Sequence, residues 1–319
     1  MPNAHTILLD HETSSQSRTW LKTKMRARPP KSFSCNFHLT SSIKPFSSPW
    51  CIKISYKEQI IAVLDHDGKK LFIFDLLTRN CIGYVSLDGR YFDFEERKGK
   101  VWIIVVCEDN SIYKYGISIA LKKIRDSNLR FSGEIACPIE WKVMTDKASN
   151  LIVDNWRRSD GFKCLDHDEG SLIYVSHVSD MSISILNSKD GTLIKRISHL
   201  KQSLASLSHP KLFLGRDGEL ILCDNKIWIV AFGNGEMILK KEVSDENFEA
   251  EALVVDEQSG NMIVSNWLSK TISIYGPSGT LIKRFSDEIL GHCCGCCINT
   301  LSGQLLVCSS SSRSVYIFK

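Results

Sequence analysis

Four cysteines and a histidine in the segment Gly291-His-Cys-Cys-Gly-Cys-Cys297 have the residue types of a metal site. Thiolate and imidazole groups are the common ligands of zinc and other soft ions. In an extended strand, however, Cys293 and Cys297 face one side and Cys294 and Cys296 the other, so the four thiols do not surround one tetrahedral ion. Two well-separated Cys-x-x-Cys pairs are also missing. We predict that this segment packs structurally, with a metal or redox site as the alternative, and we expect no metal and no cofactor.

Motifs for catalysis are missing from the rest of the chain. There is no Gly-x-Ser-x-Gly, no His-Glu-x-x-His and no glycine-rich phosphate loop. His167 and His177 stand apart from other candidate ligands or bases. We therefore predict no catalytic residues and a protein that is not an enzyme.

Composition and charge narrow the class of protein further. The 319 residues are 43% hydrophobic and 24% charged, which is typical of a globular protein. Residues 1–48 carry seven basic and two acidic residues, a net of +5 against +4 for the whole chain, so the remainder sums to −1. We predict a basic disordered tail over residues 1–31 and no nucleic-acid footprint over the body.

The expected cellular location follows from what the sequence lacks. No apolar run approaches the length of a membrane span, and the N-terminus has no secretory apolar region. The 12 cysteines are scattered through strand-like runs, which favours reduced thiols over a disulfide framework. We expect a soluble cytoplasmic protein with no membrane partner, with the nucleus as the alternative location.

An internal repeat of about 44 residues organises the chain. Gly191-Thr-Leu-Ile-Lys-Arg-Ile-Ser198 recurs 88 residues later as Gly279-Thr-Leu-Ile-Lys-Arg-Phe-Ser286, and a degenerate copy begins midway, at Gly235. Short alternating apolar runs between glycine turns surround each copy, and this pattern predicts antiparallel strands. Units of this length with four strands are typical of β-propeller blades, which are stable only when the ring closes.

We predict an all-β fold, a six-bladed β-propeller of four-stranded antiparallel blades spanning residues 32–319 as a monomer. The units lie at about residues 49–87, 90–127, 161–199, 208–244, 248–288 and 291–319. The last unit has three strands, and we expect Ser32–Thr40 to supply its outer strand and close the ring. Residues 128–160 do not fit the pattern; we favour an inserted loop over a partial seventh blade.

The blades resemble NHL repeats, the six-bladed propeller units known from TRIM-NHL proteins. The resemblance is carried by Ala62–Asp75, by Val264–Gly276 and by Val307–Phe318, each with a polar residue after one strand and a basic residue before the next. No RING or B-box zinc spacing occurs, so at most the recognition half of such a ubiquitin ligase is present. The family also contains RNA-binding propellers, and six-bladed relatives include metal-dependent lactonases and a lyase.

Loops that join the second and third strands, and loops between blades, are expected on one face of the propeller. This face carries the candidate partner-binding residues Lys69, Arg90, Tyr91, Trp267, Lys270 and Arg313. Aromatic and arginine side chains are enriched where proteins bind one another, and the mixed charges suit a protein or peptide better than a phosphate backbone. We expect a non-enzymatic interaction scaffold, possessing no metal site. RNA binding and a metal-dependent lactonase or lyase are the two alternatives, and packing of Trp267 between blades is the structural alternative for that residue.

Overall fold

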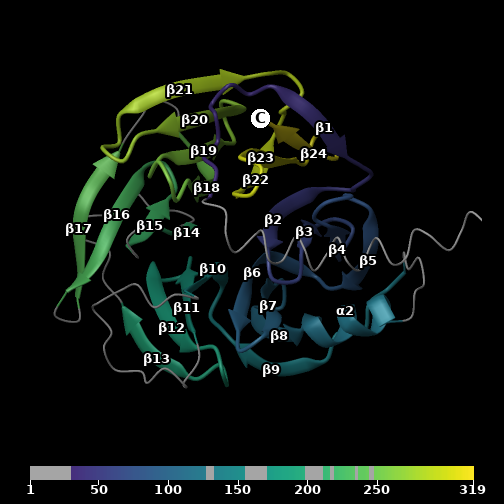
Figure 1. Ribbon diagram of the computed structural model, residues 1–319. Coiled ribbons are helices and arrows are strands. Elements are labelled where there is room, and N and C mark those ends of the chain that lie inside the picture. The colour runs from purple at the N-terminus through teal and green to yellow at the C-terminus, as the bar shows by residue number, and fades with distance from the viewer. Residues whose placement is uncertain are drawn as a thin grey trace, which may run out of the picture.

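Six four-stranded sheets stand around a central axis like the blades of a propeller (Figure 1). The computed structural model describes residues 30–126, 133–154, 171–197, 211–215, 219–233, 236–243 and 248–319. The predicted all-β fold with six antiparallel blades is confirmed. The predicted tail, apart from residues 30 and 31, lies outside the described residues. Within the described ranges, no helix is long and apolar enough to cross a membrane.

The first strand of each blade lines the centre and the fourth lies at the rim. Blades one to three comprise β2 (Pro49–Ser55), β3 (Ile60–Asp65), β4 (Lys70–Asp75) and β5 (Cys81–Ser86); β6 (Gly89–Arg97), β7 (Lys100–Cys107), β8 (Ser111–Gly116) and β9 (Ile139–Met144); and β10 (Ala148–Asp154), β11 (Leu172–His177), β12 (Ser182–Asn187) and β13 (Leu193–Ile197). Blades four to six comprise β14 (Lys211–Leu214), β15 (Leu220–Cys223), β16 (Ile227–Gly233) and β17 (Glu236–Val243); β18 (Ala250–Val255), β19 (Met262–Asn266), β20 (Thr271–Tyr275) and β21 (Leu281–Ser286); and β22 (Cys293–Asn299), β23 (Gln304–Ser309), β24 (Ser314–Phe318) and β1 (Leu39–Ile43).

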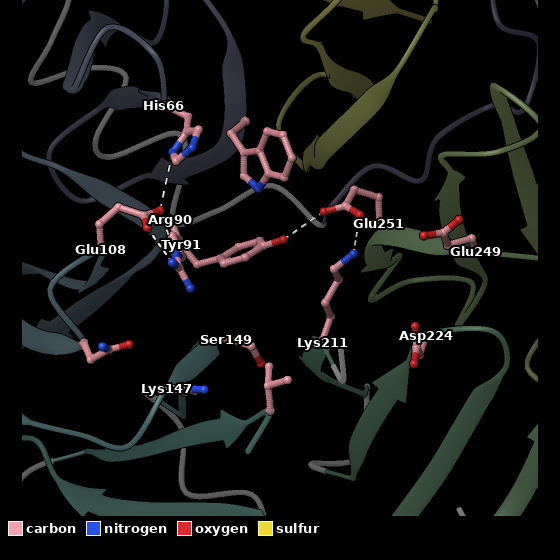
Figure 2. Close-up of a pocket in the computed structure, with 13 residues that line it drawn as sticks. His66, Arg90, Tyr91, Glu108, Lys147, Ser149, Lys211, Asp224, Glu249 and Glu251 are labelled. Atoms are coloured by element: carbon pink, nitrogen blue, oxygen red, sulfur yellow. Dashed lines mark hydrogen bonds and ion pairs between the residues drawn. The ribbon is translucent and has the colours of Figure 1, made fainter. Parts of the chain in front are cut away.

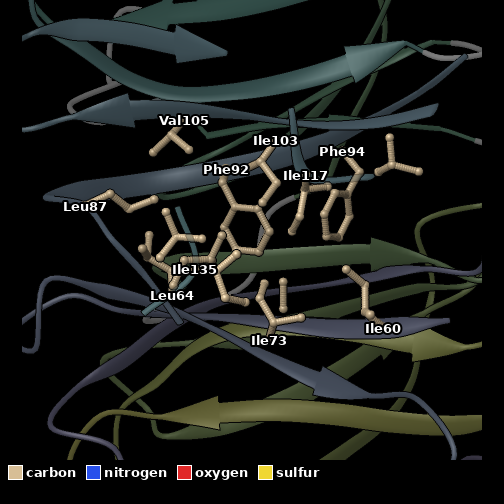
Figure 3. Packing of buried hydrophobic residues seen from close by; sticks show 14 of the residues in the cluster. Ile60, Leu64, Ile73, Leu87, Phe92, Phe94, Ile103, Val105, Ile117 and Ile135 are labelled. Carbon is tan, nitrogen blue, oxygen red and sulfur yellow. The ribbon is translucent and has the colours of Figure 1, made fainter. Parts of the chain in front are cut away.

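Apolar side chains fill the spaces between neighbouring blades. Figure 3 shows the cluster between blades one and two, where Ile60 and Ile73 meet Phe92 and Ile103. All four of these side chains are buried. Each blade is therefore apolar on both faces, and this is why its strands are nearly continuous apolar runs stabilised only in the closed ring.

The ring is closed by an N-terminal strand, as predicted, but the strand lies later in the chain. β1 pairs antiparallel with β24 and begins at Leu39 rather than at Ser32. In the segment before it, Phe37 has a left-handed backbone (φ 53°), which an extended strand does not allow. Its ring instead stacks on Phe285 at 4.4 Å between centroids, and Phe33 is buried beside it.

The outer strand of blade two differs from the prediction. The end of the predicted unit at about residues 90–127 was expected to form this strand, but Ile117–Asp126 form the helix α2. Ile117, Ala120 and Leu121 lie on one helical face and are buried against the core of blades one and two, which is the spacing of an amphipathic helix. The outer strand is β9, which lies within residues 128–160.

The predicted insertion over residues 128–160 is therefore wrong for the described part of that segment. Its residues 139–144 form β9 of blade two, and its residues 148–154 form β10, the innermost strand of blade three. β10 pairs with β11, and the stretch of chain between them lies outside the described residues. That stretch includes the start of the predicted unit at about residues 161–199. The second half of β10, from Leu151 to Asp154, is buried inside the ring.

The repeated Gly-Thr-Leu-Ile-Lys-Arg motif forms the turn before the outer strand in blades three and five. Gly191 and Gly279 both have φ of +76°, a conformation in which a side chain is strained. A Cβ at Gly191 would lie 2.5 Å from Val143 of blade two, and one at Gly279 would lie 2.5 Å from Val243 of blade four. The glycine thus recurs because this turn packs against the outer strand of the preceding blade.

Candidate functional site

A cavity of about 540 Å³ opens at the mouth of the central channel (Figure 2). It lies on the face formed by the loops between second and third strands and by the inter-blade connections, the face on which partner binding was predicted. The lining residues are Trp50, His66, Arg90, Tyr91, Glu108, Asn110, Lys147, Ser149, Val178, Lys211, Asp224, Glu249 and Glu251.

Bulges at the start of the inner strands aim side chains at this mouth. Five of the six inner strands skip one residue in their pairing with the next strand, and the unpaired residue is at the same place in each blade. These residues are Trp50, Arg90, Ser149, Glu251 and Cys294. The first four line the cavity, and Lys211, the first residue of β14, supplies the side chain of blade four. A bulge changes the direction of one side chain while the rest of the blade keeps its place. The bulged position can therefore hold a chemically different residue in each blade.

A hydrogen-bonded chain crosses the channel beneath the cavity. The Tyr91 hydroxyl donates to Glu251 Oε1 at 2.9 Å, and Lys211 Nζ donates to Glu251 Oε2. Tyr91 and Glu251 line both this cavity and a smaller one of about 30 Å³, so they form the partition between the two. Burial, together with the Glu251 charge, holds the pKa of Tyr91 well above its usual value, so the hydroxyl remains a donor.

On the opposite wall, Arg90 and Glu108 form a two-point ion pair. Arg90 Nε lies 2.6 Å from Glu108 Oε1, and its Nη2 bonds Oε2. The hydrogen bonds raise the pKa of Arg90 and lower that of Glu108, since each favours the charged forms. His66 contacts the Gly89 carbonyl at 3.3 Å and lies 4.0 Å from Glu108. The charges of Arg90 and Glu108 are thus already satisfied within this wall.

The sequence-predicted partner residues fall into three groups. Arg90 and Tyr91 line the cavity. Lys69, Lys270 and Arg313 each end the loop between the second and third strands of their blade, with φ between 48° and 53°. The recurring basic residue thus occupies a left-handed turn position, with its side chain at the surface, and Lys69 pairs with Asp88 at 2.6 Å.

Trp267 packs between blades, the structural alternative for this residue. Its ring centroid lies 4.3 Å from that of His292 and 5.8 Å from that of Trp50. Trp50 in turn lies 5.6 Å from His66, so four rings from blades five, six and one form a row beside the cavity. Trp267 remains partly exposed there, so it both stabilises the mouth and contributes to its surface.

Of the 13 residues that line the cavity, only Arg90 and Tyr91 were among the predicted partner-binding residues. The 11 that were not include the charged residues Glu108, Lys147, Lys211, Asp224, Glu249 and Glu251. The bulges place Arg90 and Glu251 at the mouth in blades two and five. The sequence of an inner strand does not by itself show which residue is skipped. One skipped residue inverts which side chains face the channel.

The cysteine-rich segment is the innermost strand of blade six, as predicted, but the expected pairing of faces is wrong. The bulge at Cys294 shifts the alternation, so Cys293 and Cys296 pack into the core towards blade five and Cys297 into the core towards blade one. All four are buried, and burial raises the pKa of each thiol, for Cys294 and Cys296 to about 12. Among the residues that the structure describes, no three His, Cys, Asp or Glu side chains are arranged to hold a metal ion.

Gly295 in the same strand gives a testable result for the packing of the inner ring. A Cβ there would lie 2.5 Å from the Trp50 carbonyl oxygen and 3.0 Å from Cys51 Cα, and backbone atoms do not yield. We expect Gly295→Ala to lower the free energy of unfolding by about 2–3 kcal/mol in urea denaturation. Gly116→Ala is the matched control, because its nearest neighbour would be an ordinary 3.5 Å away and we expect less than about 0.5 kcal/mol. Equal effects of the two substitutions would contradict the close packing of Gly295 against the backbone of blade one.

His177, at the end of β11, predicts a pH dependence of stability. Its Nδ1–H donates to the Asp146 carbonyl at 2.9 Å and its Nε2 accepts from the Ser184 hydroxyl at 2.8 Å, so the neutral ring is fully bonded. Burial is the main cause of its lowered pKa, with a smaller contribution from Arg196 opposed by Asp146 and Asp180. Below about pH 6.5 the unfolded chain binds a proton that the folded ring resists, so stability falls as pH falls.

We expect the difference in unfolding free energy between about pH 7.5 and about pH 5.5 to shrink in His177→Gln. Stability at each pH is measured by urea denaturation, and only the change with pH is compared. His38→Gln, at an exposed histidine, serves as the control and should keep the wild-type dependence. An unchanged dependence in His177→Gln would assign the acid sensitivity to other groups.

Comparison with known proteins places the fold. No protein-family model and no curated protein sequence matches the chain, so the NHL resemblance remains a prediction. Among solved structures, the β-propeller domain of Cps50 (Swd1) from Myceliophteria thermophila superposes with a TM-score of 0.62 at 12% identity, covering 88% of this chain and 99% of that one. The WD40 β-propeller domain of Doa1 gives 0.59 at 10% identity, covering 89% and 97%. At such identities the likeness establishes the architecture alone: the chain is a β-propeller with WD40 propellers among its structural neighbours.

Proposed function

We propose that this propeller is a non-enzymatic scaffold that binds a protein or peptide partner on the face bearing the mouth cavity. One observation carries the proposal: the bulges turn a repeated architecture into an asymmetric site, with tryptophan, arginine, serine and glutamate at the bulged positions of four blades and a lysine at the start of the inner strand of blade four. A site of this kind recognises a shaped, chemically varied partner.

The features of the face support a protein partner over RNA. The cavity is lined by four carboxylates, and its arginine is paired with Glu108. Such a lining repels a phosphate backbone. Carboxylates do gather at the mouth, as a lactonase or lyase site would require, but Glu251 and Glu108 are held by Lys211 and Arg90.

The proposal includes a monomeric propeller in the cytoplasm or nucleus. All 11 cysteines in the described part of the chain are free thiols, and this fits a reducing compartment. The chain is expressed in cells with a small epitope tag. Cell fractionation then tests the location, and size-exclusion chromatography tests the monomeric state.

Partner capture on the immobilised full chain tests the scaffold itself. Proteins recovered from lysate after RNase treatment are quantified for wild type, for Arg90→Glu and Trp267→Ala on the cavity face, and for Leu77→Ala. Leu77 is exposed in the turn between β4 and β5, on the opposite face. We expect at least one protein to be lost about tenfold with both cavity-face variants and retained with Leu77→Ala. The proposal would be overturned if the same proteins were recovered with the cavity-face variants as with wild type, or if RNA were recovered in place of protein.

A further inference from the structure

We propose that the mouth cavity binds a dipolar peptide segment of the partner, one with a basic side chain near one end and an acidic side chain near the other. This inference rests on the proposed function and specifies what its central site recognises. It follows from one lysine and one glutamate that stand on opposite walls of the cavity, are open to a ligand and are held in place by their backbones.

Most charged residues of the cavity lining are engaged inside the protein. Arg90 pairs with Glu108, and Lys211 pairs with Glu251. Asp224 is only 7% exposed and also interacts within the protein, so it is not offered to a ligand. These five side chains are thus held by contacts of the fold, and two charged lining residues remain.

The two remaining residues are Lys147 and Glu249. Lys147 is exposed and Glu249 is partly exposed. Within the described ranges, no residue forms an ion pair or a side-chain hydrogen bond with the ammonium of Lys147 or the carboxylate of Glu249, and the two do not pair with each other. One positive and one negative group are therefore open to a ligand.

Lys147 and Glu249 occupy the same position in blades three and five, directly before the inner strand. The Lys147 carbonyl accepts from the Val178 amide at 3.2 Å, and the Glu249 carbonyl accepts from the Trp267 amide at 3.0 Å. The Glu249 amide also donates to Asn266 Oδ1 at 3.4 Å. Each residue is thus tied to the loop between the second and third strands of its own blade, so its backbone is in place before a ligand arrives.

The two residues stand on opposite sides of the cavity. Figure 2 shows Lys147 on the side of blade three and Glu249 on the side of blade five. The side chains of Trp50, Tyr91 and Val178 supply apolar surface in the same cavity. A ligand that meets both charges must therefore cross the mouth, as an extended peptide does by advancing about 3.3 Å per residue.

The two walls favour a dipolar segment over other peptides. A segment with two like charges is attracted at one wall and repelled at the other, so its two contributions oppose each other. A neutral segment displaces water from both charged groups without supplying a counter-charge. A segment with one charge of each sign, in the matching order, is attracted at both walls.

Binding of peptide pools tests the inference. Fluorescein-labelled nonapeptides with blocked termini carry one fixed residue near each end and random residues elsewhere. The fixed pairs are arginine–glutamate, glutamate–arginine, arginine–arginine, glutamate–glutamate and glutamine–glutamine. Each pool is titrated against the full chain by fluorescence polarisation. We expect one of the two dipolar pools to bind about tenfold more tightly than the glutamine pool, the effect of two partly exposed ion pairs.

Charge reversal of each wall changes the preferred pool in a defined way. In Lys147→Glu both walls are acidic, and the arginine–arginine pool should bind best. In Glu249→Lys both walls are basic, and the glutamate–glutamate pool should bind best. The double variant Lys147→Glu/Glu249→Lys should prefer a dipolar pool again, now in the opposite order. Asp224 is unchanged in every variant, so the shifts report on the two walls alone.

Lys100→Glu and Glu257→Lys are the matched controls, because they make the same charge changes at exposed residues between the first and second strands of blades two and five, on the opposite face. Both should keep the wild-type preference. The inference would be overturned if the dipolar pools bound no more tightly than the glutamine pool, if no pool bound, or if Lys147→Glu kept the wild-type preference.

The scaffold proposal is decided by a different result. Partner capture that depends on Arg90 and Trp267 but not on Lys147 and Glu249 would retain the scaffold and reject the dipolar segment. Capture that depends on none of these four residues would reject the scaffold itself.

Discussion

Removal of residues 1–43 is expected to abolish the stable ring, whereas removal of residues 1–29 alone leaves it intact. The longer deletion takes away β1, whose Leu39 to Ile43 pair with Phe318 to Val315, and exposes the edge of β24. It also removes three buried side chains, Phe33, Phe37 and Ile43. Burial of each contributes about 1.5–3 kcal/mol, so we expect a loss of roughly 5–9 kcal/mol, comparable to the whole stability of a typical domain.

Urea denaturation followed by tryptophan fluorescence measures this loss, and a peptide in trans shows its cause. A synthetic peptide of residues 30–44 should restore cooperative unfolding to the longer deletion with a midpoint that rises with peptide concentration, because it binds only the folded ring. A peptide of the same composition in scrambled order is the control. If the two deletions unfold alike, the ring does not depend on β1.

The blade repeat was predictable from the sequence because it rests on local chemistry. The turn glycines Gly191 and Gly279, the alternating apolar runs and the basic residue of the left-handed turn in blades one, five and six are properties of short segments. These features set the number of blades and place the loops on one face. Two elements were not predictable from local sequence. One is the short helix α2, because its apolar residues also suit a strand. The other is β10, because its partner β11 lies far along the chain.

The cavity was not predictable because it depends on the pairing of the strands. The position of Glu251 at the mouth follows from a skipped residue between Ala250 and Ala252, and the sequence of β18 alone does not show which residue is skipped. The same holds for Arg90 in β6. Candidate residues chosen from loops were therefore incomplete, since the first residues of the inner strands supply much of the site.

Lys114→Met is expected to destabilise the protein by about 3–5 kcal/mol, because it removes the closest counter-charge of a buried carboxylate. Lys114 is 1% exposed on β8, and its Nζ lies 2.6 Å from Glu95 Oε2 and 2.7 Å from the Ser188 carbonyl oxygen. Glu95 is fully buried and also accepts from the Ser188 hydroxyl at 2.7 Å. Both members of this ion pair, which lies within blade two, also bond Ser188 in the turn of blade three. Without the lysine the buried carboxylate of Glu95 would keep only the more distant Arg97, whose Nε lies 3.8 Å from Glu95 Oε1.

A double-mutant cycle separates the loss of the pair from the loss of packing. Urea denaturation of Lys114→Met, Glu95→Gln and the double variant should show the double variant more stable than Lys114→Met, because the glutamine needs no counter-charge. Lys142→Met is the matched control: Lys142 pairs with Asp109 at 3.1 Å at the exposed edge of the same blade, and its loss should leave the midpoint unchanged. If the double variant is no more stable than Lys114→Met, the lysine stabilises the blade through packing on Trp102, whose ring centroid lies 4.6 Å from its Nζ, and the charge of Glu95 is not the cause. The cycle therefore decides whether Lys114 stabilises blade two through a buried charge pair or through an aromatic contact.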